Sequence, residues 1–151
     1  METLESILAE HSFLKGLEHR YLKLLTQCAS LVNFSPGQVI FTEGEKAKQF
    51  FLVRHGKVAL EIHRARRGPI TIKTIGKGDV LGWTWLVQPH HWHVDARAVE
   101  LSRAVSLDVP CVLHLCETDH DFGYEIMKRF SHALVQKLKS LNLQLVDFYD
   151  D

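Results

Sequence analysis

The sequence predicts an α+β fold in which a series of short antiparallel strands is preceded and followed by helices. Three observations support this prediction. Residues 3–10 and 18–28 have the pattern of short helices, and helical spacing of apolar residues returns after Pro110. Between these segments, short β-rich runs are separated by glycine turns, which is typical of an antiparallel barrel, sandwich or roll.

The composition indicates a folded protein with balanced charge. Of the 151 residues, 46% are apolar and 24% are charged, which suffices for a core and argues against disorder. The 18 Lys and Arg residues balance 18 Asp and Glu residues, whereas dedicated nucleic-acid binders carry a basic face. The basic run at residues 63–67 is therefore interpreted as a solvated hairpin tip, and no nucleic-acid partner is expected.

The N-terminus and the cysteines predict a cytoplasmic location. Residues 1–5 are acidic where a signal peptide would be basic, and no apolar run approaches the roughly 20 residues that cross a membrane. Cys28, Cys111 and Cys116 form no CxxC pair, so we expect free thiols in a reducing compartment. No membrane partner is expected.

The strands are predicted from short apolar runs between turns. Pro36-Gly37 and Arg54-His55-Gly56-Lys57 mark turns, and the glycine of the second turn supplies an unusual backbone angle. The clean alternation of residues 70–75 indicates a half-buried strand. The predicted strands cover residues 31–34, 39–41, 50–53, 58–62, 70–75, 93–98 and 104–107, with one more short strand just before Gly82.

The C-terminal part is predicted to be a short helix, residues 111–116, followed by a long one. Thr118 and Asp121 have capping-box spacing, so the long helix should begin near residue 119 and reach about residue 149. Its apolar residues step by three and four along a helix roughly 45 Å long. A second copy of the helix is the simplest cover for this stripe, which predicts a homodimer. The alternative is a helix that folds back and is buried within the monomer.

Several motifs in order resemble the cyclic-nucleotide-binding domain, the effector module of catabolite-activator-type bacterial regulators. They are Phe34–Glu45, Phe50–Val58, Gly78–Gly82 and Arg97-Ala98, followed by the short and long helices. The resemblance implies a double-stranded, jelly-roll-like β-roll of eight antiparallel strands with N-terminal helices and a long C-terminal dimer helix. It implies one domain over residues 1–151: a helical lid to residue 30, the β-roll at 31–108 and C-terminal helices at 109–151. A regulatory protein without enzyme activity, cofactor or metal follows, and without the DNA-binding domain that the family's regulators add after the long helix.

The candidate site is the stretch Gly76–Leu86, which is predicted to turn backbone N–H groups toward one concavity. The family's phosphate-binding cassette has a glycine followed by Glu, and later an Arg followed by a small residue. Carried over by position, Gly82 matches the glycine, Trp83 stands at the Glu, Trp92 at the Arg and His93 at the small residue. An indole offers one N–H and no charge, so cyclic AMP and cyclic GMP are not expected to bind in the usual way. The expected pocket residues are Gly82, Trp83, Thr84, Trp92 and His93.

Three alternatives to an ordinary cyclic-nucleotide receptor remain open. The pocket could take a different small ligand, with Trp83, Trp85 and Trp92 stacking on it. It could be filled by these indoles and serve a protein partner, or it could bind a cyclic nucleotide through non-standard contacts. A fourth hypothesis, a cupin-like metal enzyme, starts from His91, His93 and Asp95, but Glu100 does not have the spacing of a third ligand.

Overall fold

The computed structural model describes residues 2–64, 66, 68–83, 85 and 90–150, except for the side chains of residues 64 and 148–150. The contacts divide the chain into two compact units, Met1–Val112 and Leu113–Asp151, and each is described by itself. Thr84 and Leu86 of the candidate stretch lie outside the described residues, as do residues 87–89.

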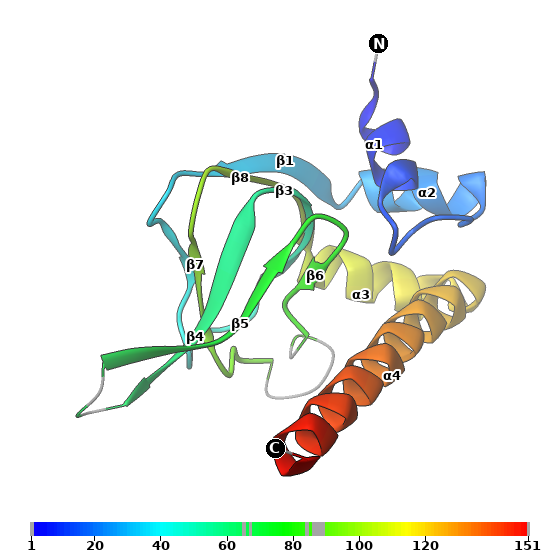
Figure 1. Cartoon of the computed structure of the whole chain (residues 1–151). Helices are drawn as coiled ribbons and strands as arrows, with labels where there is room; N and C mark the ends of the chain where they lie inside the picture. The colour runs from blue at the N-terminus through cyan, green and yellow to red at the C-terminus, as the bar shows by residue number, and fades with distance from the viewer. Residues whose placement is uncertain (1, 65, 67, 84, 86–89, 151) are drawn as a thin grey trace. The chain divides into compact units, whose positions relative to one another are not determined.

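In its described part, the first unit contains two four-stranded antiparallel sheets (Figure 1). The strand orders are β1-β8-β3-β6 in the first sheet and β2-β7-β4-β5 in the second. The α+β class and the antiparallel two-sheet architecture with flanking helices are therefore confirmed. The strands are β1 Ala29–Phe34, β2 Val39–Phe41, β3 Gln49–His55, β4 Lys57–Arg64, β5 Gly68–Gly76, β6 Val80–Leu81, β7 Asp95–Ala98 and β8 Ser102–Asp108.

The hairpin between β3 and β4 depends on Gly56. Its φ angle of 100° lies in the left-handed region, as the sequence predicts. A Cβ at this position would stand 2.6 Å from the carbonyl oxygen of Leu101 and from the Cα of Ser102. Glycine is therefore required both by the backbone angle and by the close approach of the neighbouring chain segment.

Strand β3 contains a β-bulge at Arg54. Val53 pairs with Ala104 of β8, but the next paired residue, Arg103, faces His55. Two residues of β3 thus stand opposite one residue of β8. Such a bulge bends the strand and changes the direction of a side chain.

Two short helices precede the sheets, α1 Leu4–Glu10 and α2 His19–Thr26. Thr3 and Ser6 form a reciprocal capping box at the start of α1. Tyr21, Leu22 and Leu25 of α2 are buried, as their helical spacing predicts. Both helices are one or two residues shorter than predicted at their ends.

The expectation of three free thiols is wrong. Cys28 and Cys111 form a disulfide, and their Cα atoms lie 5.6 Å apart. The two residues are 83 positions apart in sequence, and only the fold brings the start of β1 beside the start of the helix after β8. Cys116 is the one free cysteine among the described residues.

Helix α3, Val109–Thr118, ends in the second unit, and α4 spans His120–Asp150. The predicted cap at Thr118 is wrong: the Asp119 carboxylate accepts from the Phe122 N–H at 3.1 Å, and the Thr118 hydroxyl donates back to His114. Asp119 caps the helix instead, because a carboxylate accepts hydrogen bonds from the free N–H groups at the N-terminal end and interacts favourably with the helix dipole. No described helix is both long and apolar enough to span a membrane.

The apolar stripe of α4 changes character along the helix. Phe122, Ile126 and Phe130 near its start are buried. Farther along, large apolar side chains are more than a third exposed: Leu134, Val135, Leu138, Leu141, Leu143, Leu145 and Val146. The predicted stripe is present, and its second half remains uncovered within the described chain.

Candidate functional site

The candidate site lies where the two sheets of the first unit meet, at Gly82. This residue follows β6 of the first sheet, and its φ angle of 102° lies in the left-handed region. Trp92 precedes β7 of the second sheet, yet its ring lies against the Gly82 backbone. A Cβ at Gly82 would stand 2.6 and 2.7 Å from the ring carbons Cη2 and Cζ3 of Trp92. The indole therefore occupies the space next to the predicted anion-binding backbone.

Two stacked aromatic pairs surround Gly82. Trp92 stacks on Phe41 with ring centroids 3.9 Å apart, and Trp85 stacks on Phe50 with centroids 4.4 Å apart. The two indoles are 5% and 0% exposed. A Cβ at Gly82 would also lie 3.5 Å from Phe50, so the two pairs meet at this glycine. We call Phe41, Phe50, Trp85 and Trp92 the aromatic cluster.

Backbone hydrogen bonds hold Trp92 in place. Its N–H donates to the Glu45 carbonyl, and its own carbonyl accepts from the Gly44 N–H, both at 2.9 Å. One residue earlier, His91 forms a β-bridge with Lys46. The ring position is thus fixed by paired backbone on both sides of the 44–46 turn, which limits how far Trp92 can swing away from Gly82.

The structure brings together only part of the predicted pocket. Gly82 and Trp92 are in direct contact, and Trp83 is half-buried beside them in sequence. His93 is exposed. Thr84 lies outside the described residues. Trp85, which was weighed as a stacking residue, is buried in the aromatic cluster.

Arg97 of β7, five residues after Trp92, is paired with Glu61. Its Nε and Nη2 donate to the two carboxylate oxygens of Glu61 at 3.2 and 2.9 Å. The side-chain hydrogen bond and the charge of Glu61 raise the pKa of Arg97. Ala96 and Ala98 are buried on one face of β7, so Arg97 points to the opposite face. The Arg97 guanidinium is therefore engaged by Glu61 on the face of β7 opposite to the buried alanines.

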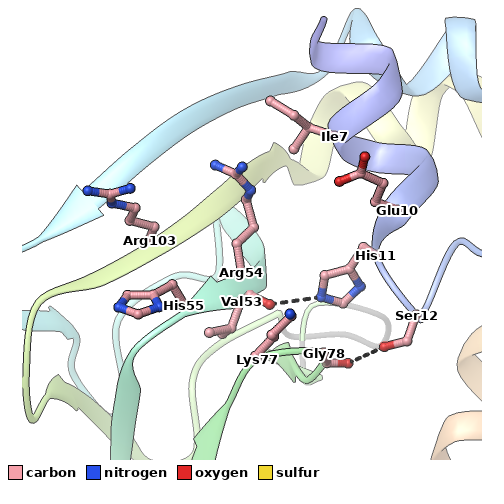
Figure 2. Close-up of a pocket in the computed structure, with 10 residues that line it drawn as sticks. All are labelled: Ile7, Glu10, His11, Ser12, Val53, Arg54, His55, Lys77, Gly78 and Arg103. Atoms are coloured by element: carbon pink, nitrogen blue, oxygen red, sulfur yellow. Dashed lines mark hydrogen bonds between the residues drawn. The ribbon is translucent and has the colours of Figure 1, made fainter. Parts of the chain in front are cut away.

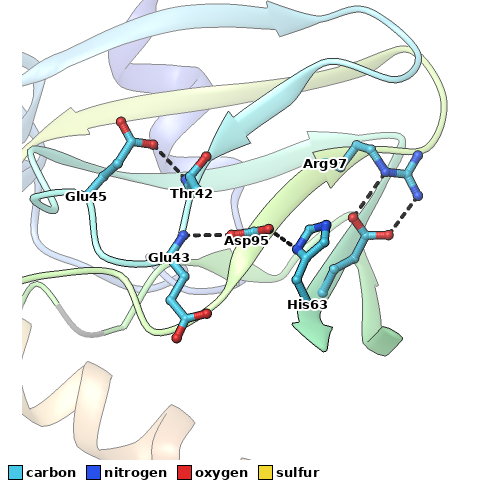
Figure 3. A network of polar contacts seen from close by, with 7 residues as sticks. Thr42, Glu43, Glu45, His63, Asp95 and Arg97 are labelled. Carbon is cyan, nitrogen blue, oxygen red and sulfur yellow. Dashed lines mark hydrogen bonds and ion pairs between the residues drawn. The ribbon is translucent and has the colours of Figure 1, made fainter. Parts of the chain in front are cut away.

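The residues of the metal-enzyme alternative, His91, His93 and Asp95, do not gather into a metal site in the described structure. β7 begins at Asp95, so His91 and His93 do not alternate on a strand as predicted. The Asp95 carboxylate instead accepts from His63 at 2.6 Å and from the Glu43 N–H at 2.7 Å (Figure 3). His90 contacts the Trp85 carbonyl at 2.6 Å. Within the described residues, no three His, Cys, Asp or Glu side chains gather to hold a metal ion.

A cavity of about 330 Å³ adjoins the aromatic cluster. Phe41 and Trp92 form part of its wall, and Lys46 and Lys48 contribute cationic side chains. The Glu45 carboxylate also lines it but is engaged by the Thr42 N–H at 2.9 Å (Figure 3). Its volume is at the lower end of what small-molecule sites have.

Sequence analysis missed the partners that shape this site. Phe41 and Phe50 were assigned only to strands, although they stack on the two buried indoles. Glu61 carried a usable signal, because a single acid inside the apolar run 58–62 indicates a buried carboxylate that needs a cation. Nothing in the sequence placed that cation at Arg97.

Comparisons with known proteins agree with this architecture. The family model for the cyclic nucleotide-binding domain matches residues 31–119. The CRP-like cAMP-activated global transcriptional regulator of Mycobacterium tuberculosis is 28% identical over 145 residues, which cover 95% of this chain. The chain spans 62% of the length of that curated relative.

Two solved structures have the same fold. The candidate cyclic nucleotide-binding protein of Geobacter metallireducens GS-15 aligns with a TM-score of 0.79 and 25% identity, over 91% of this chain and 99% of that chain. The regulatory subunit of a cAMP-independent protein kinase A from Trypanosoma cruzi, bound to guanosine, aligns with a TM-score of 0.60 and 25% identity. That alignment covers 78% of this chain and 46% of the kinase subunit.

The family model covers more than half of the sequence, and both sheets, the N-terminal helices and the long helix α4 follow the family's architecture. The family consists of regulatory domains that bind small ligands and are typically non-enzymatic. The chain belongs to the cyclic nucleotide-binding domain family.

Proposed function

We propose that this chain is a ligand-sensing regulatory domain that does not bind cyclic AMP or cyclic GMP in the way usual for its family. The observation that carries the proposal is the indole of Trp92 packed against the backbone of Gly82. The sugar-phosphate of a cyclic nucleotide would need this space. The degenerate cassette inferred from Trp83 and Trp92 supports the same conclusion.

The chemistry of the site supports the proposal as strongly as its shape. A buried phosphate needs a charged donor, and removing such a partner costs about 2–5 kcal/mol. Arg97 is held by Glu61 and points to the other face of β7. Trp83 has no acceptor for a ribose hydroxyl. The cost of burying the phosphate is therefore not offset at Gly82.

A planar ligand without a phosphate fits the cavity beside Phe41 and Trp92 better than a cyclic nucleotide does. The stacked rings of Phe41 and Trp92 supply an aromatic wall, and base-like rings stack well on such surfaces. The guanosine bound to the Trypanosoma cruzi relative is a ligand of this kind. We propose that the chain acts as a single regulatory domain that passes on occupancy of this cavity to a protein partner, and that it has no enzyme activity.

The tryptophans allow a direct test, because all three lie between residues 83 and 92. Intrinsic fluorescence and the melting temperature should be measured with millimolar cyclic AMP, cyclic GMP, guanosine and adenosine. A ligand that binds the folded state raises the melting temperature by mass action. Cyclic AMP and cyclic GMP, which we expect not to bind, should therefore leave both signals unchanged. A nucleoside that quenches the fluorescence and raises the melting temperature would identify the ligand class.

The result that contradicts the proposal is equally clear. A saturable rise in melting temperature of several degrees with cyclic AMP would mean that Trp92 yields to the nucleotide. The cavity with Lys46 and Lys48 would then serve a cyclic nucleotide through non-standard contacts. The same titration on a Lys46→Gln and Lys48→Gln double variant would show whether the cyclic nucleotide binds at these lysines or beside Gly82.

We also propose a homodimer through α4. The exposed apolar side chains in the second half of this helix support it, because a monomer rarely leaves such a continuous stripe uncovered. Light scattering should give twice the mass of one chain. Leu134→Glu together with Leu141→Glu should give the mass of one chain, and an unchanged mass would refute the assignment to this helix.

A further inference from the structure

A second cavity lies outside the two sheets, between the N-terminal segment and the outer side of the first sheet. It has a volume of about 570 Å³, in the range of small-molecule sites. The side toward the strands presents Arg54, Lys77 and Arg103, and the helical side presents Glu10, His11 and Ser12 (Figure 2). We call this space the basic cavity.

The charge of the basic cavity departs from that of the whole protein. Three fixed cations, Arg54, Lys77 and Arg103, face one carboxylate, Glu10, although the chain overall carries equal numbers of acidic and basic residues. Across the described part of the chain, none of these three cations forms an ion pair with a carboxylate. Clustered cations without a protein partner repel one another, and an anionic ligand would remove that cost.

The β-bulge places Arg54 and His55 beside the same space. In a regular strand, consecutive residues such as Arg54 and His55 would face opposite sides of the sheet. Because both stand opposite Arg103, Arg54 and His55 line the same cavity, whereas the buried Val53 contributes its carbonyl. Bulges that redirect a side chain are frequent beside functional sites. Arg54 and Arg103 thus come from neighbouring strands, so two planar guanidinium groups face one space.

The floor of the cavity is held by hydrogen bonds that involve no cation. The Val53 carbonyl accepts from His11 Nε2 and from the Gly78 N–H, each at 3.0 Å. His11 Nδ1 accepts from the Phe13 N–H, which fixes the ring as the neutral Nε2–H tautomer. The Ser12 hydroxyl donates to the Gly78 carbonyl at 2.9 Å. The helical segment is therefore fastened to the turn after β5, and the cations are left to a ligand.

We propose that the basic cavity binds a small phosphate ester, with the phosphate held by Arg54, Arg103 and Lys77. Arginine matches a phosphate with two parallel N–H donors, and lysine adds a mobile charge. The Glu10 carboxylate would repel a second anionic group but accepts hydrogen bonds from hydroxyl or amino groups. The ligand should therefore carry its phosphate at one end and hydroxyl or amino groups at the other, as a phosphorylated polyol or sugar does.

Amide chemical shifts can test this site with simple probes. The probes are glycerol 3-phosphate, inorganic phosphate and, as the uncharged control, glycerol, each titrated at low ionic strength. Glycerol 3-phosphate should shift the amides of Arg54, Lys77, Gly78 and Arg103 in a saturable way. Inorganic phosphate should shift the same amides with lower affinity, and glycerol should shift none of them.

Variants distinguish the cavity from general attraction of anions. Arg54→Gln with Arg103→Gln should weaken glycerol 3-phosphate binding about tenfold or more, since hydrogen bonds to charged groups are lost. Lys77→Gln, an exposed turn residue whose change should not affect folding, should weaken it by a smaller factor. Lys73→Gln removes an exposed charge on β5 outside the cavity and should bind like the wild type.

Several results would overturn the proposal. They are an absence of saturable shifts, shifts centred on Lys46 and Lys48, and equal binding by the Arg54→Gln and Arg103→Gln variant when its spectrum shows an intact fold. Equal weakening by Lys73→Gln would also overturn it, because the effect would then be a property of net charge. The outcome does not depend on whether cyclic nucleotides bind near Gly82.

Discussion

Strand β3 contributes to two regions of the first unit that differ in almost every physical property. Near its start, Phe50 belongs to the aromatic cluster, where buried indoles occupy the space beside Gly82. Near its end, Arg54 lines the basic cavity, which is open and whose cations pair with no carboxylate of the described residues. In this chain the buried aromatic rings gather at one place and the cations that line a cavity gather at another.

This difference shows why membership of a family does not by itself locate the ligand. The backbone of Gly82 has a left-handed angle, and the indole of Trp92 lies against it. The side chains that pack around this glycine are aromatic, so the turn supports packing in this chain. Function has to be argued from the site, not from the fold.

The largest expected effect comes from removing the indole of Trp92. Trp92→Ala should lower the free energy of unfolding by about 3–5 kcal/mol, because a buried ring stacked on Phe41 is replaced by a cavity. Urea denaturation followed by circular dichroism measures this change. His93→Ala, at the exposed neighbouring residue, is the control and should stay within about 0.5 kcal/mol of the wild type.

A loss below about 1 kcal/mol for Trp92→Ala would mean that the ring contributes little to the core. The aromatic cluster would then be a loose plug that a ligand can displace. That result would weaken the contrast with the basic cavity and favour a functional pocket at Gly82.

The fold that surrounds the aromatic cluster could largely be predicted from the sequence. The glycine turns and the order of the motifs carried the two-sheet fold. A strand is present at residues 70–75, but the prediction that it is half-buried is wrong, because residues 70–74 are exposed and only Ile75 is buried. Gly82 and Trp92 were expected in one pocket, and in the structure the two residues are neighbours. Their direct contact could not be predicted, because it depends on how the segment before β7 crosses to the other sheet. The stacking partners Phe41 and Phe50 depend on the same tertiary contact.

The second prediction compares alanine substitutions at two glycines with left-handed backbone angles, Gly82 and Gly44. Gly82→Ala should cost about 1–2 kcal/mol for the left-handed backbone and about 1–3 kcal/mol more for the overlap with Trp92. Gly44→Ala is the matched control, because its φ angle of 90° is similar but a Cβ there would meet nothing within 4 Å. It should show only the backbone cost. Equal losses of unfolding free energy would show that the space beside Gly82 is not tightly filled.

The basic cavity could not be predicted from the sequence. Arg54 was assigned to a turn, and no local pattern marks a bulge that depends on the register with β8. Arg103 and Lys77 are separated from Arg54 by 49 and 23 positions, so only the pairing of β3 with β8 and β6 brings the three together. The disulfide between Cys28 and Cys111 was missed for the same reason.

The smallest expected effect concerns His11 on the floor of the basic cavity. Burial lowers the pKa of His11 below its usual 6.5, while its bond to Val53 and the charge of Asp79 oppose this. Above about pH 6.5 the ring is neutral in both the folded and unfolded chain. As the pH falls through 6.5, the unfolded chain binds a proton that the folded chain resists, so the free energy of unfolding decreases until the folded pKa is passed.

His11→Gln removes this titration, and the glutamine amide can still donate to the Val53 carbonyl. Between neutral pH and about pH 5.5, urea midpoints should fall less for this variant than for the wild type. His132→Gln, an exposed position on α4, should follow the wild-type curve. Parallel curves for the wild type and His11→Gln would mean that water reaches the ring, and the floor of the basic cavity would then be looser than its hydrogen bonds indicate.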